Sequence, residues 1–186
     1  MAEGKRILIG GGVRSGKSAF AVSLARQLGG RRVFVATAQE IDAEMCDRIT
    51  RHQEERGADF VTLEEPIELV ATLRRLAQVD VVVIDCLTVW IANLLVGGME
   101  EAAIATHINE LAALLAGLPF HTIMVTNEVG MGVHPETALG RTFRDVVGRA
   151  HQRLARGADE IYFAALGVIL RLQPGPVTLL PFEERS

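Results

Sequence analysis

The chain has 186 residues, a length that suits one domain with a full core, and no shift in composition marks a linker, so we expect a single domain over residues 1–186. Its 49% hydrophobic and 23% charged residues exclude a disordered chain. A net charge of -4 and a pI near 5.7 supply no basic field for a phosphate backbone, which argues against nucleic-acid binding and favours small-molecule partners.

Short β-branched runs alternate with longer segments of helical period along the chain, which predicts an α/β fold with a mostly parallel sheet and helices on both faces. Strands are expected at RILIG (6–10), RVFVAT (32–37), FVTL (60–63), VVVID (81–85), HTIMVT (121–126), EIYFAAL (160–166) and GVILRL (167–172). Helices are expected over 17–28, 41–56, 67–77, 87–116 with a break at Gly97 and Gly98, and 137–156. The last two strands are too close for a crossover helix, so they should form an antiparallel hairpin at one edge. The tail beyond residue 172 has no predicted role.

A glycine-rich phosphate loop follows the first strand. The stretch GGVRSGKS places Gly11, Gly16, Lys17 and Ser18 in the G-x-x-x-x-G-K-[ST] spacing, between a strand and a helix. Glycines let the backbone N–H groups converge on phosphate oxygens, and the helix N-terminus adds its positive dipole end. Arginine fills 17 of the 19 basic positions, so the lysine kept here indicates a loop that needs a compact ammonium. Lys17 is predicted to reach the outer phosphates and Ser18 to bind Mg²⁺.

Polar side chains end two other predicted strands. Asp85 ends VVVID, where an acidic residue commonly holds the metal of a phosphate site, although it could equally cap the next helix. Asn127 and Glu128 follow HTIMVT at the edge where open α/β sheets bind ligands. A simple turn built on Gly130 and Gly132 is the alternative for that segment.

A histidine in the run DRITRHQEERG is a candidate for chemistry. On a helix, His52 continues the apolar stripe of Met45 and Ile49, with Arg48 and Arg56 one turn to either side. The neighbouring positive charge favours a neutral imidazole, which can act as a nucleophile. A histidine satisfied by a backbone carbonyl near the core remains the alternative.

No other segment changes this picture. The apolar run ILIGGGV is too short and too rich in glycine for a signal peptide or a membrane span. Cys46 and Cys86 lie forty residues apart without a CxxC or Cys/His ligand spacing, so neither a zinc site nor a disulfide framework is indicated. We therefore expect a cytoplasmic protein with reduced thiols and no membrane span.

Several long motifs resemble one family. GGVRSGKSAFA, VATAQEIDAEMCDRITRHQEER, FVTLEEP and above all VTNEVGMGVHPETALGRTFRDVVGRAHQRLA make the chain similar, over about residues 6 to 172, to the bifunctional adenosylcobinamide kinase / adenosylcobinamide-phosphate guanylyltransferases of cobalamin biosynthesis. The resemblance implies a RecA-like P-loop NTPase fold, a homotrimer, and Mg²⁺, ATP and GTP at one nucleotide site. It implies phosphorylation of the aminopropanol hydroxyl of adenosylcobinamide, followed by GMP transfer from GTP to adenosylcobinamide phosphate, which gives adenosylcobinamide-GDP.

The same resemblance implies roles for individual residues. His52 would be the nucleophile that carries GMP, and Lys17 would act in catalysis. Ser18 and Asp85 would hold the metal. The nucleotide-binding positions would be Gly11, Gly12, Val13, Arg14, Ser15, Gly16, Lys17, Ser18, Ala36, Thr37, Ala38, Gln53, Glu54, Glu55, Arg56, Glu64 and Asp85. Two other functions compete with this one: a P-loop small-molecule kinase in which His52 is structural, and a RecA-like ATPase, which the acidic pI disfavours.

Overall fold

The fold was analysed in a computed structural model, which describes residues 4–38, 57–176 and 178–181. The predicted helix 41–56, and with it His52 and Gln53 to Arg56, lies outside the described residues. The strands of the described residues are β1 (Arg6–Gly11), β2 (Arg32–Ala36), β3 (Phe60–Glu64), β4 (Val81–Asp85), β5 (His121–Asn127), β6 (Glu160–Ala165), β7 (Val168–Gln173) and β8 (Thr178–Pro181). Their helices are α1 (Lys17–Leu28), α3 (Leu69–Arg75), α4 (Leu87–Val96), α5 (Glu101–Leu115) and α6 (Ala138–Ala155), with a short 3-10 turn at Gly57–Asp59.

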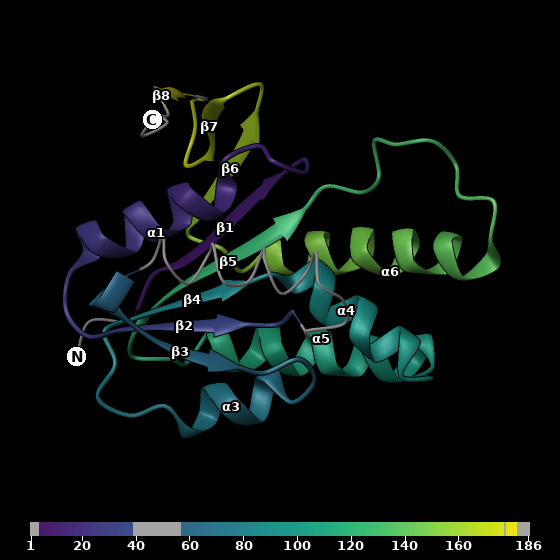
Figure 1. Cartoon of the computed structure of the whole chain (residues 1–186), viewed down its shortest axis with the longest axis horizontal. Helices are drawn as coiled ribbons and strands as arrows, with labels where there is room; N and C mark the ends of the chain where they lie inside the picture. The colour runs from purple at the N-terminus through teal and green to yellow at the C-terminus, as the bar shows by residue number, and fades with distance from the viewer. Residues whose placement is uncertain (1–3, 39–56, 177, 182–186) are drawn as a thin grey trace.

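Within the described part of the chain, eight strands form one sheet in the order β3-β2-β4-β5-β1-β6-β7-β8 (Figure 1). The first six strands in this order, β3-β2-β4-β5-β1-β6, run parallel. Strand β7 pairs antiparallel with β6 and with β8. The predicted hairpin is therefore confirmed, and its turn runs through Leu166 and Gly167, both of which have a positive φ. Strand β8 was not predicted.

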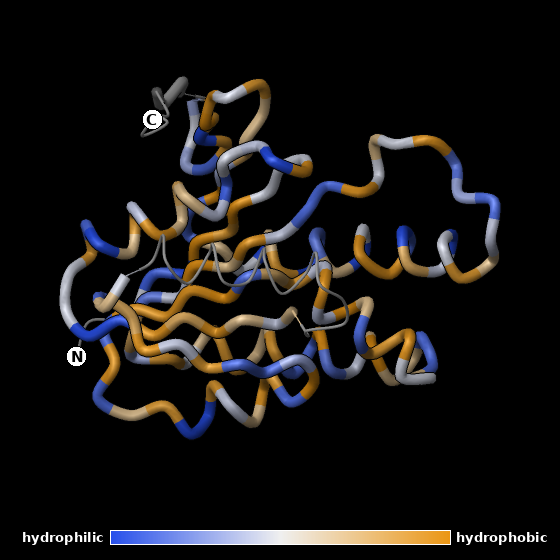
Figure 2. The backbone as a smooth tube through the Cα atoms, in the orientation of Figure 1, coloured by the Kyte–Doolittle hydropathy of each residue, from blue (hydrophilic) through white to orange (hydrophobic). Residues whose placement is uncertain are grey.

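Helices cover both faces of the sheet, as predicted. Alternate residues of the central strands point to opposite faces, and both sets are apolar, as expected of parallel strands buried on two sides. On one face Ile7 and Ile9 pack with Ala21 and Ala25 of α1. On the other face residues such as Leu8 pack in one cluster with α3, α4, α5 and α6. Figure 2 shows the resulting band of apolar residues through the middle of the sheet.

Local sequence explains where the helices end. Helix α1 stops at Gly29, which has a φ of 77° that favours glycine. The predicted break in the long segment 87–116 separates α4 from α5, because Gly97 and Gly98 follow α4 and Gly98 has a φ of 84°. Helix α6 begins after Thr137, whose hydroxyl accepts a hydrogen bond from the Gly140 N–H. None of the described helices is long and apolar enough to cross a membrane.

Candidate functional site

The carboxyl ends of the parallel strands bring the predicted polar residues to one edge of the sheet. Ala36 pairs in register with Glu64 on one side and with Asp85 on the other, and Gly11 pairs with Asn127. Neighbouring strands lie about 4.8 Å apart, so Asp85 on β4 is about 10 Å from β1, and the exposed Glu64 on β3 is about 19 Å from it. Asp85 can therefore serve a group bound near the end of β1, whereas Glu64 can reach only the far end of an extended ligand.

The loop after β1 is shaped by close packing and by backbone conformation. A Cβ atom at Gly11 would lie 2.6 Å from the Ala164 carbonyl oxygen and 2.8 Å from the Ser15 Oγ, so no side chain fits there. Gly16 has a φ of 86° and precedes α1, and no side chain caps the helix. The first N–H groups of α1 therefore remain available to an anion, which is the arrangement of phosphate-binding loops.

The Lys17 ammonium is held at this loop. The side chain is buried, and its Nζ donates a hydrogen bond of 2.9 Å to the Gly12 carbonyl. Its charge also acts on the Cys86 thiol beyond the end of β4. Lys17 thus places a largely desolvated positive charge between the loop and the β4 end, where it suits the outer phosphates of a nucleotide. Among the described residues, the buried Ser15 Oγ has no hydrogen-bond partner.

A buried threonine joins the ends of β2 and β4. The Thr37 Oγ1 donates to the Cys86 carbonyl and accepts from the Cys86 N–H, both at 2.8 Å, and the Thr37 N–H donates to the Asp85 carbonyl at 3.1 Å. The Asn93 Nδ2 donates to the Thr37 carbonyl at 2.8 Å. These bonds fix the backbone that carries Asp85. Because the Thr37 hydroxyl makes both of its hydrogen bonds to the Cys86 backbone, it stabilises the backbone of the site.

Cys86 is not a candidate nucleophile. Burial, together with the nearby Asp85 carboxylate, raises the pKa of its thiol to about 11. The thiol therefore stays protonated near neutral pH, and a protonated thiol neither attacks phosphorus nor binds a metal well.

A buried polar network lies at the end of β5. The Thr88 Oγ1 accepts from the Asn127 N–H at 2.7 Å and contacts the Thr126 Oγ1 at 3.2 Å. The Thr126 Oγ1 in turn hydrogen-bonds the His151 Nε2 of α6 at 2.7 Å, and the His151 Nδ1 lies 3.7 Å from the Glu128 Oε2. Burial lowers the pKa of His151, although the Glu128 carboxylate opposes the shift. A neutral imidazole therefore links α6 to the strand that adjoins the phosphate loop.

This network also fastens the segment after β5 to the loop. The Glu128 N–H donates to the Gly11 carbonyl at 3.0 Å. Among the described residues, the buried Asn127 Oδ1 lacks a hydrogen-bond partner. Sequence reasoning predicted Asn127 and Glu128 at this edge but missed Thr88 and His151, because their partners lie 25 to 39 residues away in the chain.

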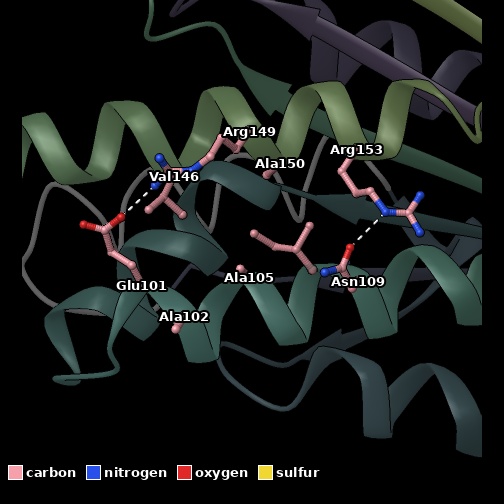
Figure 3. A pocket seen from close by; sticks show the side chains of 9 residues that line it. Glu101, Ala102, Ala105, Asn109, Val146, Arg149, Ala150 and Arg153 are labelled. Atoms are coloured by element: carbon pink, nitrogen blue, oxygen red, sulfur yellow. Dashed lines mark hydrogen bonds and ion pairs between the residues drawn. The ribbon is translucent and has the colours of Figure 1, made fainter.

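Two cavities lie near α6. One, of about 240 Å³, is lined by Gly10, Thr126, Glu128 and His151 among others, directly behind the strand of the phosphate loop. The other, of about 400 Å³, lies between α5 and α6 (Figure 3). Its floor contains Ala102, Ala105 and Ala150, and its rim carries the Glu101–Arg149 ion pair and the Arg153–Asn109 hydrogen bond. The second cavity includes none of the predicted site residues.

The described residues suit a metal that takes most of its ligands from elsewhere. Ser18 and Asp85 offer a hydroxyl and a carboxylate oxygen, which are the hard ligands that Mg²⁺ prefers. The structure's described ranges contain no group of three or more His, Cys, Asp or Glu residues placed to hold an ion. One or two protein oxygens completed by phosphate and water is the usual arrangement for Mg²⁺ at a nucleotide, so this donor pair fits it.

Comparison with known proteins decides the family. The profile of the family described as cobinamide kinase / cobinamide phosphate guanyltransferase matches residues 7–172. The chain belongs to this family. It is 39% identical over 173 residues to the bifunctional adenosylcobalamin biosynthesis protein CobP of Pseudomonas aeruginosa, a match that covers 92% of the chain and 99% of the relative. It is 38% identical over 184 residues to the CobU protein of Salmonella typhimurium, covering 90% and 99%.

Solved structures show the same fold in more distant proteins. The chain resembles the RadB recombinase with a TM-score of 0.52 and 15% identity, and the match covers the whole chain and 84% of that protein. It resembles a type III secretion ATPase with a TM-score of 0.54 and 12% identity, covering 89% and 52%. The expected RecA-like P-loop fold is therefore confirmed, and at such low identity these likenesses concern the fold alone.

Proposed function

We propose that this enzyme of cobalamin biosynthesis catalyses two consecutive transfers at one nucleotide site. It phosphorylates the aminopropanol hydroxyl of adenosylcobinamide with ATP or GTP, and then transfers GMP from GTP to the resulting phosphate to form adenosylcobinamide-GDP. The observation that carries the proposal is a complete phosphate loop with a buried lysine, in a chain that belongs to the cobinamide kinase / cobinamide phosphate guanyltransferase family.

In the first reaction the protein binds, orients and stabilises charge. The N–H groups of residues 11 to 18 and the Lys17 ammonium hold the β- and γ-phosphates, and the ammonium stabilises charge that develops on the transferred group. Mg²⁺, held by Ser18 and Asp85, would neutralise phosphate charge when bound. The substrate hydroxyl oxygen attacks the γ-phosphorus and gives up its proton to water, the bond from that phosphorus to the bridging oxygen breaks, and the nucleoside diphosphate leaves with the electron pair.

The second reaction uses His52. A nitrogen of the neutral imidazole attacks the α-phosphorus of GTP, the bond to the bridging oxygen breaks, and pyrophosphate leaves with the electron pair. A phosphate oxygen of adenosylcobinamide phosphate then attacks the same phosphorus and releases the histidine. Dividing the transfer into two displacements lets a bulky acceptor enter after pyrophosphate has left.

The remaining predicted residues would bind the nucleotide away from its outer phosphates. Ala36 to Ala38 and Gln53 to Arg56 would lie beside it. Glu64 ends β3 about 19 Å from β1, which is compatible with a contact to the nucleoside end of an extended GTP and not with one to its phosphates. The proposal includes a homotrimer in the cytoplasm, acting on small molecules and not on nucleic acid.

The decisive experiment is incubation of the protein with α-labelled GTP and Mg²⁺ in the absence of adenosylcobinamide and its phosphate. Wild-type protein should acquire an acid-labile, base-stable label, as a phosphoramidate bond requires, and the His52→Asn variant should acquire none. Equal labelling of the two proteins would remove His52 from this role. A wild-type protein that phosphorylates adenosylcobinamide but never takes up label would instead be a small-molecule kinase.

A further inference from the structure

Three neighbouring connections at the carboxyl edge of the sheet, the phosphate loop among them, carry apolar side chains that point into solvent. Val13 on the loop itself has 72% of its surface exposed. Met131 and Val133, on the segment between β5 and α6, are 81% and 94% exposed. Leu166, in the turn between β6 and β7, is fully exposed. Exposed apolar side chains that gather beside a functional site commonly mark a binding surface.

Sheet order makes the three connections that carry these residues neighbours. β1 lies between β5 and β6 and runs parallel to both, so the connections that follow β5 and β6 emerge on either side of the loop that follows β1. Figure 1 shows the β5–α6 segment arching out on one side of that loop and the β6–β7 turn rising on the other. Figure 2 shows apolar positions, in orange, along the β5–α6 segment.

The β5–α6 segment is held at both ends. At its start the Glu128 N–H binds the Gly11 carbonyl, and the Glu128 carboxylate accepts from the Gly130 N–H. At its end the Arg141 Nη1 donates to the carbonyls of Pro135 and Glu136, at 3.1 and 2.7 Å. These hydrogen bonds fix the two ends of the segment that carries Met131 and Val133, so a ligand that covers these side chains has less backbone to order.

We propose that Met131, Val133 and Leu166, with Val13 between them, form the acceptor platform, the surface on which the corrinoid ring system of the cobinamide substrate rests. This inference rests on the proposed function and adds the residues that would bind the acceptor. A corrinoid is a broad macrocycle with apolar faces and polar amide arms, and apolar side chains around a phosphate site suit such a face. The nucleotide is held through its phosphates by the loop, so the platform is left for the second substrate.

Equilibrium dialysis, following the visible absorbance of adenosylcobinamide, tests the platform without depending on turnover. In the Met131→Ser/Val133→Ser variant the Kd for adenosylcobinamide should rise about tenfold, which corresponds to about 1.4 kcal/mol and is a fraction of what fully burying two such side chains contributes. Leu166→Asn should weaken binding as well, because it replaces an apolar side chain of the platform with a polar one. Asparagine tolerates the positive φ of 54° at this position, so the turn should keep its shape.

Val96→Ser is the matched control, because Val96 is 77% exposed at the end of α4, a helix that contributes no residue to the platform. It should bind adenosylcobinamide like wild type, whereas Val133→Ser alone should already weaken binding. Nucleotide affinity, measured with a fluorescent GTP analogue, should stay within about twofold in all variants.

Three results would overturn the platform. The first is an unchanged Kd for adenosylcobinamide in the double variant. The second is a loss of nucleotide affinity in its place, which would make these side chains a base-binding surface. The third is a change in molar mass by light scattering, which would assign them to a contact between copies of the chain. Wild-type protein that binds adenosylcobinamide without phosphorylating it would refute the proposed function and leave the platform standing.

Discussion

Replacing Thr37 with valine tests how the backbone that carries Asp85 is held. The Thr37 side chain is fully buried, and its hydroxyl bonds both the N–H and the carbonyl of Cys86 at 2.8 Å. Valine keeps the shape of threonine but makes neither bond. The Cys86 carbonyl still accepts from the Trp90 N–H at 3.1 Å, so the uncompensated group is the Cys86 N–H.

One buried donor without a partner costs about 1–3 kcal/mol, and we expect Thr37→Val to lower the free energy of unfolding by about that amount. Thr37→Ser is the matched control. It keeps both hydrogen bonds and removes one methyl group, which costs about 1 kcal/mol. Guanidinium unfolding at neutral pH, with an unchanged dependence on denaturant, measures both variants.

A functional consequence should accompany the loss of stability. Because Thr37 fixes the end of β4, the valine variant should need more Mg²⁺ than the serine variant to reach half-maximal phosphoryl transfer. If Thr37→Val proved as stable as wild type, the hydroxyl would not support this backbone, and the reasoning from its hydrogen bonds would be refuted.

Three further predictions concern other parts of the site. Gly11→Ala should destabilise the protein by about 1–3 kcal/mol and weaken nucleotide binding, because the new Cβ would meet the Ala164 carbonyl at 2.6 Å; a wild-type melting temperature and GTP affinity would contradict this. Burial lowers the pKa of His151 below its usual 6.5, so the unfolded chain takes up this proton first as the pH falls, and wild type should lose more stability than His151→Gln between pH ~7.5 and ~5. An equal loss of stability in the two proteins over that pH range would show that His151 does not cause the pH dependence. In a Cys46→Ser background, Cys86 should resist alkylation at pH ~8 until the protein unfolds, because its thiol is buried with a pKa of about 11; rapid labelling of the native protein would contradict the burial.

The sequence predicted most of the elements because their patterns are local. The apolar runs of β1, β4 and β5 and the helical periods of α1 and α6 are visible within short windows, and glycines mark where α1 and α4 end. Strand β8 was missed because the prolines at positions 174 and 176 interrupt the apolar tail and no pairing partner can be read from a single strand.

The site was only partly predictable for the same reason. The phosphate loop is one contiguous motif, and Asp85 ends a recognisable buried strand, so both could be placed at one edge of the sheet. The pairing of Thr37 with Cys86 and that of Thr126 with His151 depend on tertiary packing, which no local pattern encodes. His52 was singled out by helical phasing and by family resemblance, and it stays a prediction because it lies outside the described residues.

The central claim is that one nucleotide site performs two transfers and that His52 separates them. Its most direct test is the product formed by the His52→Asn variant from adenosylcobinamide, GTP and Mg²⁺, resolved by chromatography and mass spectrometry. Wild type should yield adenosylcobinamide-GDP, and the variant should accumulate adenosylcobinamide phosphate at a rate close to that of the wild-type first step. Formation of adenosylcobinamide-GDP by the variant would contradict the account.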